Sequence, residues 1–283
     1  MDGAASEHPA SDHLDPCLNC EATLRPGDEY CSRCGQRNLP SKLALWELIR
    51  EVLVESFDLD GRVFRTLLPF LFKPGFLSVE YCRGRRAAYT SPFRLFLAAT
   101  FLWLASGFVV DQRYDFETET GAQDVIQVDA SAADGGGGFS RWLVEQGQHF
   151  DALPEAEQAR QLSAAASAAV PKAALAMTPV FALLLMLLFA RSGRYYVEHL
   201  VFALHVHAFG FVLAALALPL FGVRPVPLLA MALLLVYLYV GLWTAYETRW
   251  WTAVLRLIVL LMVHSVVLTL ASATIILATI MLG

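Results

Sequence analysis

Four cysteines stand near the start of the chain in the pattern CxxC-x10-CxxC. They are Cys17, Cys20, Cys31 and Cys34. Thiolates in two such pairs are typical ligands of tetrahedral zinc, because each pair forms a tight turn that presents two sulfur atoms. The sequence therefore predicts a zinc ribbon over residues 17–37, with zinc as a structural cofactor. A closed shell of four ligands organises a fold but indicates no reaction.

The ribbon is predicted to depend on its metal, because a unit of about 20 residues cannot bury enough apolar surface to fold alone. Gly35 directly follows the last cysteine, where the turn needs a residue that tolerates positive φ. Glu21 holds the matching place in the first turn, which is therefore less ideal. Two interpretations stay open: a structural staple, or a zinc-dependent module that recognises a partner.

A second group of residues with chemical potential lies in apolar segments and comprises Glu198, His199, His207 and His264. At 100° per residue, His199 and His207 share the helix face that carries the small residues, and His205 points nearly opposite. Counting helical rise places His207 and His264 at similar depth, so they could face each other. The group is either a haem, metal or proton-relay site, or a set of interhelical hydrogen bonds that only stabilise packing.

The segments that carry these histidines are predicted to cross a membrane. Hydrophobic residues make up 57% of the 283 residues, and about 20 apolar residues span a bilayer. Stretches that meet or approach this length are 92–110, 174–190, 198–221, 226–246 and 253–282. We therefore expect an all-α integral membrane bundle with about five transmembrane helices. Residues 1–16 are polar, so we expect a disordered tail and no signal peptide there.

Charge predicts how the chain is threaded. The segment from Gly35 to Arg94 holds ten Lys and Arg, whereas Asp111 to Lys172 holds eleven Asp and Glu against four Lys and Arg. Basic loops stay in the cytoplasm, so the N-terminus and the ribbon are expected inside, and 111–172 outside. The basic loop 191–194 then falls inside and the C-terminus outside. Cytosolic thiols stay reduced, which agrees with zinc rather than disulfides.

The region 38–90 is predicted to hold amphipathic and interfacial helices before the bundle of 91–283. An amphipathic helix is expected over 41–57, and the apolar run 63–72 is too short to span. A turn at 73–75 and a helix over 76–83 follow. The arginines that precede the first span are Arg83, Arg85 and Arg86. They are expected either to contact lipid phosphates or only to set the topology.

Two prolines bound the predictions for the outside segment. A helix is expected around 139–170, ending at Pro171, and Pro179 is expected to kink the second span. Ser91 and Pro92 form a predicted N-cap and first residue of the first span. Cys82 stands alone and is expected to be a small buried residue rather than a reactive thiol.

Several motifs, in their order along the chain, resemble one known family. They are YCSRCGQ, FDLDGRVFRTL, YCRGRRAAYTSPFRLF and YYVEHLVFALHVHAF. Together they are similar to the bacterial membrane protein family of unknown function numbered 3667, over most of the chain except the outside segment. The resemblance implies a bacterial inner-membrane protein with a cytosolic ribbon, and it implies no activity.

No motif for phosphate binding, nucleophilic catalysis or a zinc protease is found in the sequence. We therefore expect a non-enzymatic envelope scaffold or signalling-associated protein, whose ribbon contacts a cytosolic protein or a second copy of the chain. Membrane lipids are expected partners, and nucleic acid is not. The alternative is a metal- or haem-dependent membrane oxidoreductase or transporter that uses the intramembrane histidines.

Overall fold

The computed structural model describes residues 16–25, 27–38, 62–113, 138–220 and 223–282. Within these ranges the regular elements are helices, and no strand is present beyond two isolated bridges in the ribbon. The all-α fold class is therefore confirmed for the described residues. The tail before Pro16 and the helix predicted over 41–57 lie outside them.

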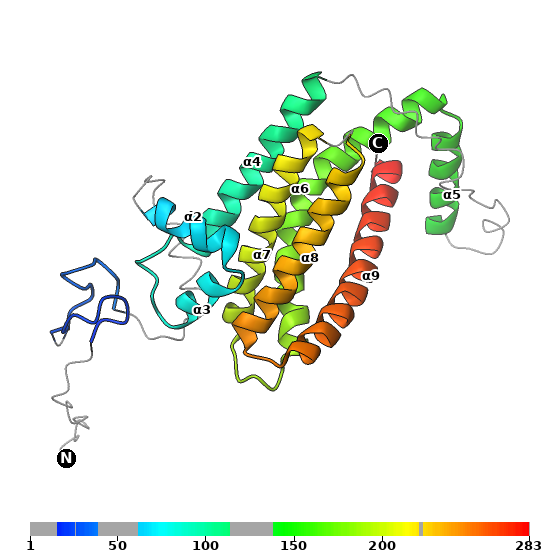
Figure 1. Cartoon of the computed structure of the whole chain (residues 1–283). Coiled ribbons are helices and arrows are strands. Elements are labelled where there is room, and N and C mark those ends of the chain that lie inside the picture. The colour runs from blue at the N-terminus through cyan, green and yellow to red at the C-terminus, as the bar shows by residue number, and fades with distance from the viewer. Residues whose placement is uncertain (1–15, 26, 39–61, 114–137, 221–222, 283) are drawn as a thin grey trace, which may run out of the picture.

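Upright helices packed side by side form the body of the molecule (Figure 1). They are α4 (Pro92–Arg113), α6 (Glu155–Leu188), α7 (Tyr196–Ala217), α8 (Pro225–Tyr246) and α9 (Trp250–Leu282). A short 3-10 turn, η2 (Leu218–Leu220), extends α7. α7 packs against α4, α6 and α8, and its buried residues lie all round the helix. Such a helix forms the centre of a bundle.

Three of these helices are long and apolar enough to cross a membrane: Tyr196–Leu220, Pro225–Tyr246 and Trp250–Ile275. Their bounds agree with three of the predicted spans. The apolar parts of α4 and α6 are shorter, Pro92–Gly107 and Ala176–Leu188. The chain thus has the helices of a membrane protein, but length and hydropathy do not confirm all five predicted spans.

The predicted helix over 139–170, with its end at Pro171, is wrong in its bounds. One helix, α5, covers Gly138–Asp151, and α6 then runs for 34 residues through Pro171 and Pro179. The break falls at Pro154, whose extended backbone (φ −53°, ψ 141°) begins α6. The alanine-rich stretch before Pro171 has high helix propensity, which outweighs the one hydrogen bond that a proline removes.

Two short helices, α2 (Arg62–Phe72) and α3 (Phe76–Cys82), lie beside the upright helices, as predicted for 63–72 and 76–83 (Figure 1). The hydroxyl of Tyr237 on α8 donates to the carbonyl of Phe70 at 2.9 Å. That carbonyl belongs to the last turn of α2, where backbone acceptors lack helical partners. This bond therefore attaches α2 to the bundle.

The turn between α2 and α3 contacts α8 closely. Gly75 has φ +81°, and a Cβ there would lie 2.8 Å from the carbonyl oxygen of Gly241. Both the backbone conformation and the missing side chain therefore require glycine. At the start of α4, the backbone N–H of Arg94 approaches the Ser91 hydroxyl at 3.5 Å, which agrees with the predicted N-cap.

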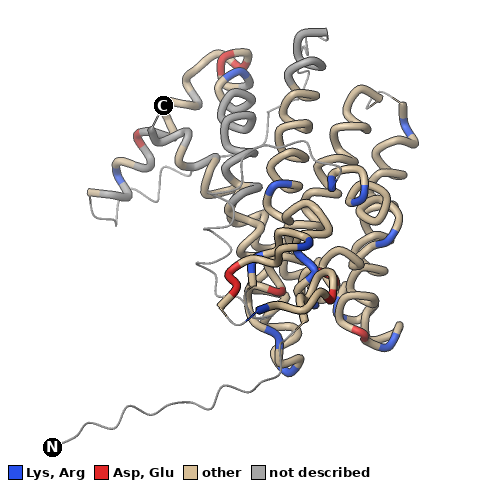
Figure 2. The backbone as a smooth tube through the Cα atoms, turned by 90° about the vertical axis from the view of Figure 1, so that its left-hand side faces the viewer, with Lys and Arg blue, Asp and Glu red and all other residues tan. Residues whose placement is uncertain are grey.

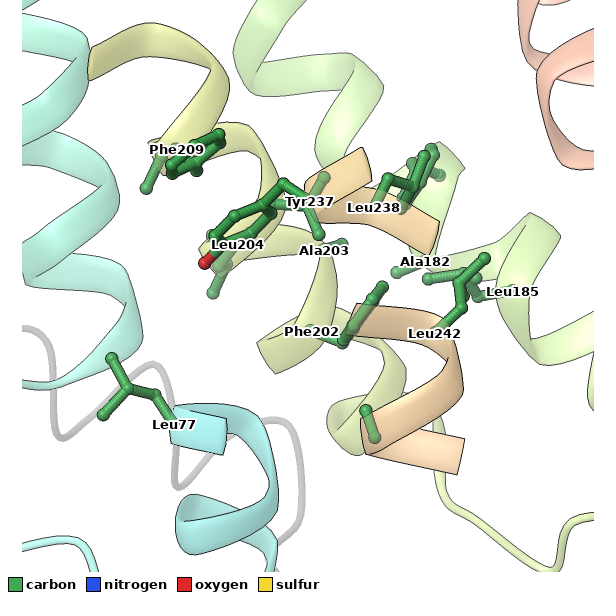
Figure 3. Packing of buried hydrophobic residues seen from close by; sticks show 14 of the residues in the cluster. Leu77, Ala182, Leu185, Phe202, Ala203, Leu204, Phe209, Tyr237, Leu238 and Leu242 are labelled. Atoms are coloured by element: carbon green, nitrogen blue, oxygen red, sulfur yellow. The ribbon is translucent and has the colours of Figure 1, made fainter. Parts of the chain in front are cut away.

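The hydrophobic core lies among α4, α6, α7 and α8, and it extends to α3 through Leu77 (Figure 3). The rings of Phe209 and Tyr237 stack with centroids 3.7 Å apart, so α7 and α8 are in direct contact at this level of the bundle. The small residues Ala203 and Ala182 let the helices around them approach closely. This core determines how the histidines of α7 meet their neighbours.

Candidate metal centre and buried histidines

The ribbon consists of two turns with the same hydrogen bonds. In the first, the N–H of Glu21 donates to the Cys17 carbonyl at 2.8 Å, and in the second the N–H of Gly35 donates to the Cys31 carbonyl at 2.8 Å. Glu21 has φ 60° and Gly35 has φ 71°. Glu21 therefore adopts the left-handed conformation that glycine adopts without cost, as its position in the motif predicted.

The two turns bring all four sulfur atoms together. The Sγ atoms of Cys17 and Cys34 are 3.7 Å apart, and those of Cys20 and Cys31 are 3.6 Å apart. All four lie within 4.8 Å of one another. A tetrahedron with metal–sulfur bonds of about 2.3 Å has edges of about 3.8 Å, so the donor set fits a metal ion of the zinc type. The four cysteines are therefore a site that could hold a metal ion.

Cysteine pKa values differ within the ribbon. A hydrogen bond with the Ala22 backbone lowers the pKa of Cys20, but burial and the neighbouring cysteines raise it to about 12. Backbone N–H groups of Cys34 and Arg33 lower the pKa of Cys31 to about 7, which favours the thiolate that a metal binds.

Burial raises the pKa of Cys82 to about 12, and the nearby Glu198 raises it further. Cys82 is thus a protonated thiol, as expected for an unreactive cysteine, but it is only partly buried, whereas the sequence predicted a buried residue.

The ribbon is attached to the loop that precedes α4. The side chain of Gln36 donates to the Gly84 carbonyl at 2.8 Å and accepts from the N–H groups of Arg86 and Ala87 at 3.0 and 3.1 Å. Leu18 packs on Gly84, where an added Cβ would lie 2.7 Å from the Leu18 side chain. This contact could not be predicted from the sequence, because a glutamine after a cysteine turn carries no signal of what it binds.

The arginines of that loop have protein partners. Arg83 and Arg85 approach the Glu80 carboxylate at 3.4 and 3.1 Å, and the guanidinium of Arg86 lies 5.1 Å from the Tyr81 ring centre. Glu80 is buried, with 4% of its surface exposed. The Glu80 carboxylate therefore offsets part of the positive charge that was expected to contact lipid phosphates or to set the topology. Figure 2 shows charged residues gathered around the ribbon and this end of the bundle.

His207 and His264 lie close together, as the helical geometry predicted. Their ring centres are 6.4 Å apart, and each ring also contacts the edge or face of Phe181, at 5.1 and 5.2 Å. Nδ1 of His207 donates to the Ala203 carbonyl at 2.9 Å, so its Nε2 is the unprotonated nitrogen. Nδ1 of His264 is buried without a hydrogen-bond partner among the described residues.

His199 and Glu198 lie elsewhere and do not join this pair. Nδ1 of His199 is 2.7 Å from the Tyr246 hydroxyl, which comes from the end of α8. Glu198 accepts the backbone N–H of Tyr195 at 2.8 Å and so caps the start of α7. The four residues considered as one intramembrane site are therefore divided between two places in the bundle.

His205 is separate from the other histidines, as predicted, but it has a partner that the sequence did not reveal. Its Nδ1 lies 2.9 Å from the Ser78 hydroxyl of α3. Both side chains are buried, with 5% and 3% of their surfaces exposed. The bond joins the short helices before the first upright helix to the centre of the bundle.

Residues 60–104 match the family described as a protein of unknown function (DUF3667). The family resemblance is confirmed over this segment. The segment contains α2, α3, the loop that precedes α4 and the first part of α4. The match therefore covers the loop that the ribbon contacts. No curated protein and no solved structure matches the chain.

Proposed function

We propose that the protein is a multi-pass protein of the bacterial inner membrane, with five spans and its ribbon in the cytoplasm. Two observations support α4 and α6 as the first and second spans: both stand in the same bundle as the three long apolar helices (Figure 1), and both have apolar portions. The basic segment before α4 and the acidic segment after it support the orientation.

Cysteine labelling in intact cells tests this threading. A cysteine introduced at Gly136 should react with a membrane-impermeant maleimide, and one at Ser192 should react only after permeabilisation. The matched control is the same pair of variants in permeabilised cells, where both should react. Reversed labelling, or a C-terminal reporter that is active in the cytoplasm, contradicts the topology.

The metal of the ribbon is proposed to be zinc. Cys17, Cys20, Cys31 and Cys34 would hold it, and the metal would supply a structural cross-link between the two turns. Support comes from the all-sulfur donor set and from spacings close to those of a zinc tetrahedron. The purified full-length chain should contain about one zinc per chain. Equal zinc in a variant with all four cysteines replaced by serine refutes the assignment.

The role that these features support best is non-enzymatic: an envelope scaffold or signalling-associated protein whose ribbon is a contact module. The observation that carries this proposal is the set of hydrogen bonds by which Gln36 seats the ribbon on the loop before α4. That contact ties the metal site mechanically to the bundle. Tyr30 of the ribbon stays 57% exposed and can contact a cytosolic protein or a second copy of the chain.

Photo-crosslinking in cells tests the contact role. A benzophenone amino acid in place of Tyr30 should give a discrete cross-linked product, and the mass of this product distinguishes a second copy from another protein. The same probe in a Cys31→Ser background is the matched control and should give no product, because the ribbon loses its fold. Absence of a product in both backgrounds argues against a contact module.

The alternative, a metal- or haem-dependent oxidoreductase or transporter, rests on the pair His207 and His264. The observations that favour it are their proximity and the buried Nδ1 of His264, which has no hydrogen-bond partner in the part of the chain that the structure describes. An optical spectrum of the protein purified in detergent separates the two proposals. A strong Soret band supports the alternative, whereas zinc without a chromophore supports the contact module.

A further inference from the structure

An open pocket lies where α6 ends, α8 ends and α9 begins. Its volume is about 450 Å³. The residues that define its chemistry are Phe189, Arg191, Ser192, Tyr246 and Arg256. It is remote from the ribbon in sequence and independent of the contact role proposed above.

Two aromatic rings of the pocket contact guanidinium groups, of which that of Arg256 lines the pocket, whereas that of Arg194 lies outside the lining and donates to the Ala245 carbonyl. The rings of Phe189 and Tyr246 stack with centroids 3.8 Å apart. The guanidinium of Arg256 lies 4.2 Å from the centre of the Phe189 ring, and that of Arg194 lies 4.8 Å from the centre of the Tyr246 ring. A guanidinium over a ring is attracted by its π face and keeps N–H groups for an anion.

The positive charge of the pocket is not balanced by its own lining. Arg191 and Arg256 line it, and no carboxylate does. Glu247 follows the lining residue Tyr246 in sequence but does not line the pocket, and Glu198 caps α7 instead. Two guanidinium groups with the nearby hydroxyl of Ser192 form a donor set that matches the oxygens of a phosphate group.

The surroundings of the pocket match the level at which phospholipid headgroups lie. Trp250 and Trp251 begin α9 with 65% and 50% of their surfaces exposed, and tryptophan is enriched at the membrane–water interface. Leu187 lines the pocket with 64% exposure, so an apolar wall continues from the cations along the outside of the bundle. Basic pockets between membrane helices bind anionic headgroups.

We propose that the pocket between α6, α8 and α9 binds a phosphate group through Arg191 and Arg256, supplied by an anionic phospholipid headgroup or by a free phosphate. The guanidinium groups donate N–H hydrogen bonds to the phosphate oxygens, and the Phe189 ring holds Arg256 in place. With a phospholipid, the acyl chains lie against the exposed apolar surface that Leu187 begins.

Native mass spectrometry of the full-length protein in detergent, titrated with phosphatidylglycerol, tests the proposal. The wild-type protein should retain bound lipid, and Arg191→Gln/Arg256→Gln should bind it about tenfold more weakly or worse, because charge-assisted hydrogen bonds are lost. Arg249→Gln is the matched control: this exposed arginine lies at the same end of the bundle but outside the pocket, and its loss should leave binding unchanged.

The source of the phosphate is resolved by two further titrations. Phosphatidylcholine should bind more weakly than phosphatidylglycerol if the ligand is an anionic lipid. Inorganic phosphate that binds the delipidated protein, without retention of phosphatidylglycerol, assigns the pocket to a soluble anion. In both cases the arginine variant should lose the binding.

Equal binding by the wild-type and double-variant proteins overturns the proposal, and so does an equal loss in Arg249→Gln. If the double variant does not fold, Arg191→Gln and Arg256→Lys replace it. Arg191 is exposed in a loop and Lys keeps the charge of Arg256, so both should fold and both should weaken binding. Unchanged binding in both folded single variants is an equally clear refutation.

Discussion

The ribbon and the bundle place their chemically competent side chains in different ways. In the ribbon, the ligands lie within 18 residues of chain, and two local turns bring four sulfur atoms within 4.8 Å. In the bundle, His199, His205 and His207 lie on one helix, yet each meets a different neighbour. Local spacing therefore predicts the first site, whereas the second depends on which helix packs on which face.

The two regions meet at the loop before α4. Gln36 of the ribbon binds that loop, and Ser78 of the preceding helix binds His205 at the centre of the bundle. A chain of packed and hydrogen-bonded groups thus runs from the metal site to α7. The comparison can be tested by breaking each region separately and measuring how far the effect extends.

The largest effect is expected from loss of the metal. Cys31→Ser should abolish metal binding and unfold the ribbon, because zinc contributes on the order of 10 kcal/mol to the folding of such modules. Metal analysis and limited proteolysis of the ribbon are the measurements. Cys82→Ser is the matched control and should leave both unchanged, because that thiol lies outside the metal site. A protease-resistant ribbon in Cys31→Ser would show that the turns fold without metal.

The next largest effect concerns the contact between the ribbon and the loop before α4. Gln36→Ala should leave the metal bound but release the ribbon from the loop, at a cost of about 2–3 kcal/mol in docking, since buried backbone groups lose their partners. Hydrogen exchange of the N–H groups of Arg86 and Ala87 should accelerate. Exchange at the wild-type rate would mean that the contact between Leu18 and Gly84 is enough to hold the ribbon on the loop.

A smaller loss is expected at His205. His205→Leu strands the buried hydroxyl of Ser78 and should lower the free energy of unfolding by about 1–2 kcal/mol. His205→Leu/Ser78→Ala should recover part of this loss, because both polar groups are then removed. His205→Leu should be additive with His207→Leu, which lies on another face of α7. No recovery in the double variant would indicate that the bond contributes little.

Replacing Glu21 should stabilise the ribbon. Glu21→Gly removes the strain of positive φ and should stabilise the metal-bound form by about 1 kcal/mol, measured as resistance to a chelator. Gly35→Ala in the second turn is the matched opposite change and should weaken it by a similar amount. If both substitutions have the same sign, backbone conformation does not explain the difference between the turns.

The weakest effect is expected between His207 and His264. Their rings pack edge to face and no hydrogen bond joins the two described side chains, so the coupling energy should be about 0.6 kcal/mol. A double-mutant cycle with His207→Leu and His264→Leu, read by thermal unfolding in detergent, measures it. A coupling above about 2 kcal/mol would instead support a shared metal or proton.

Much of the local structure could be predicted from the sequence because it depends on neighbours in the chain. The structure agrees with the predicted turns that gather the four cysteines, the short helices over 63–72 and 76–83, and three apolar helices. The prediction failed at Pro171, because a proline was assumed to end a helix that alanine propensity continues. Hydropathy also cannot decide five spans when the apolar parts of α4 and α6 are short.

The sequence by itself determined the four-thiolate site and the paired depth of His207 and His264, because both follow from fixed spacing along one chain. The tertiary structure decided that Gln36 seats the ribbon, that His199 pairs with Tyr246, and that Arg191 and Arg256 share a pocket. These contacts join residues dozens of positions apart. No periodicity in the chain encodes them, because they depend on how the helices pack.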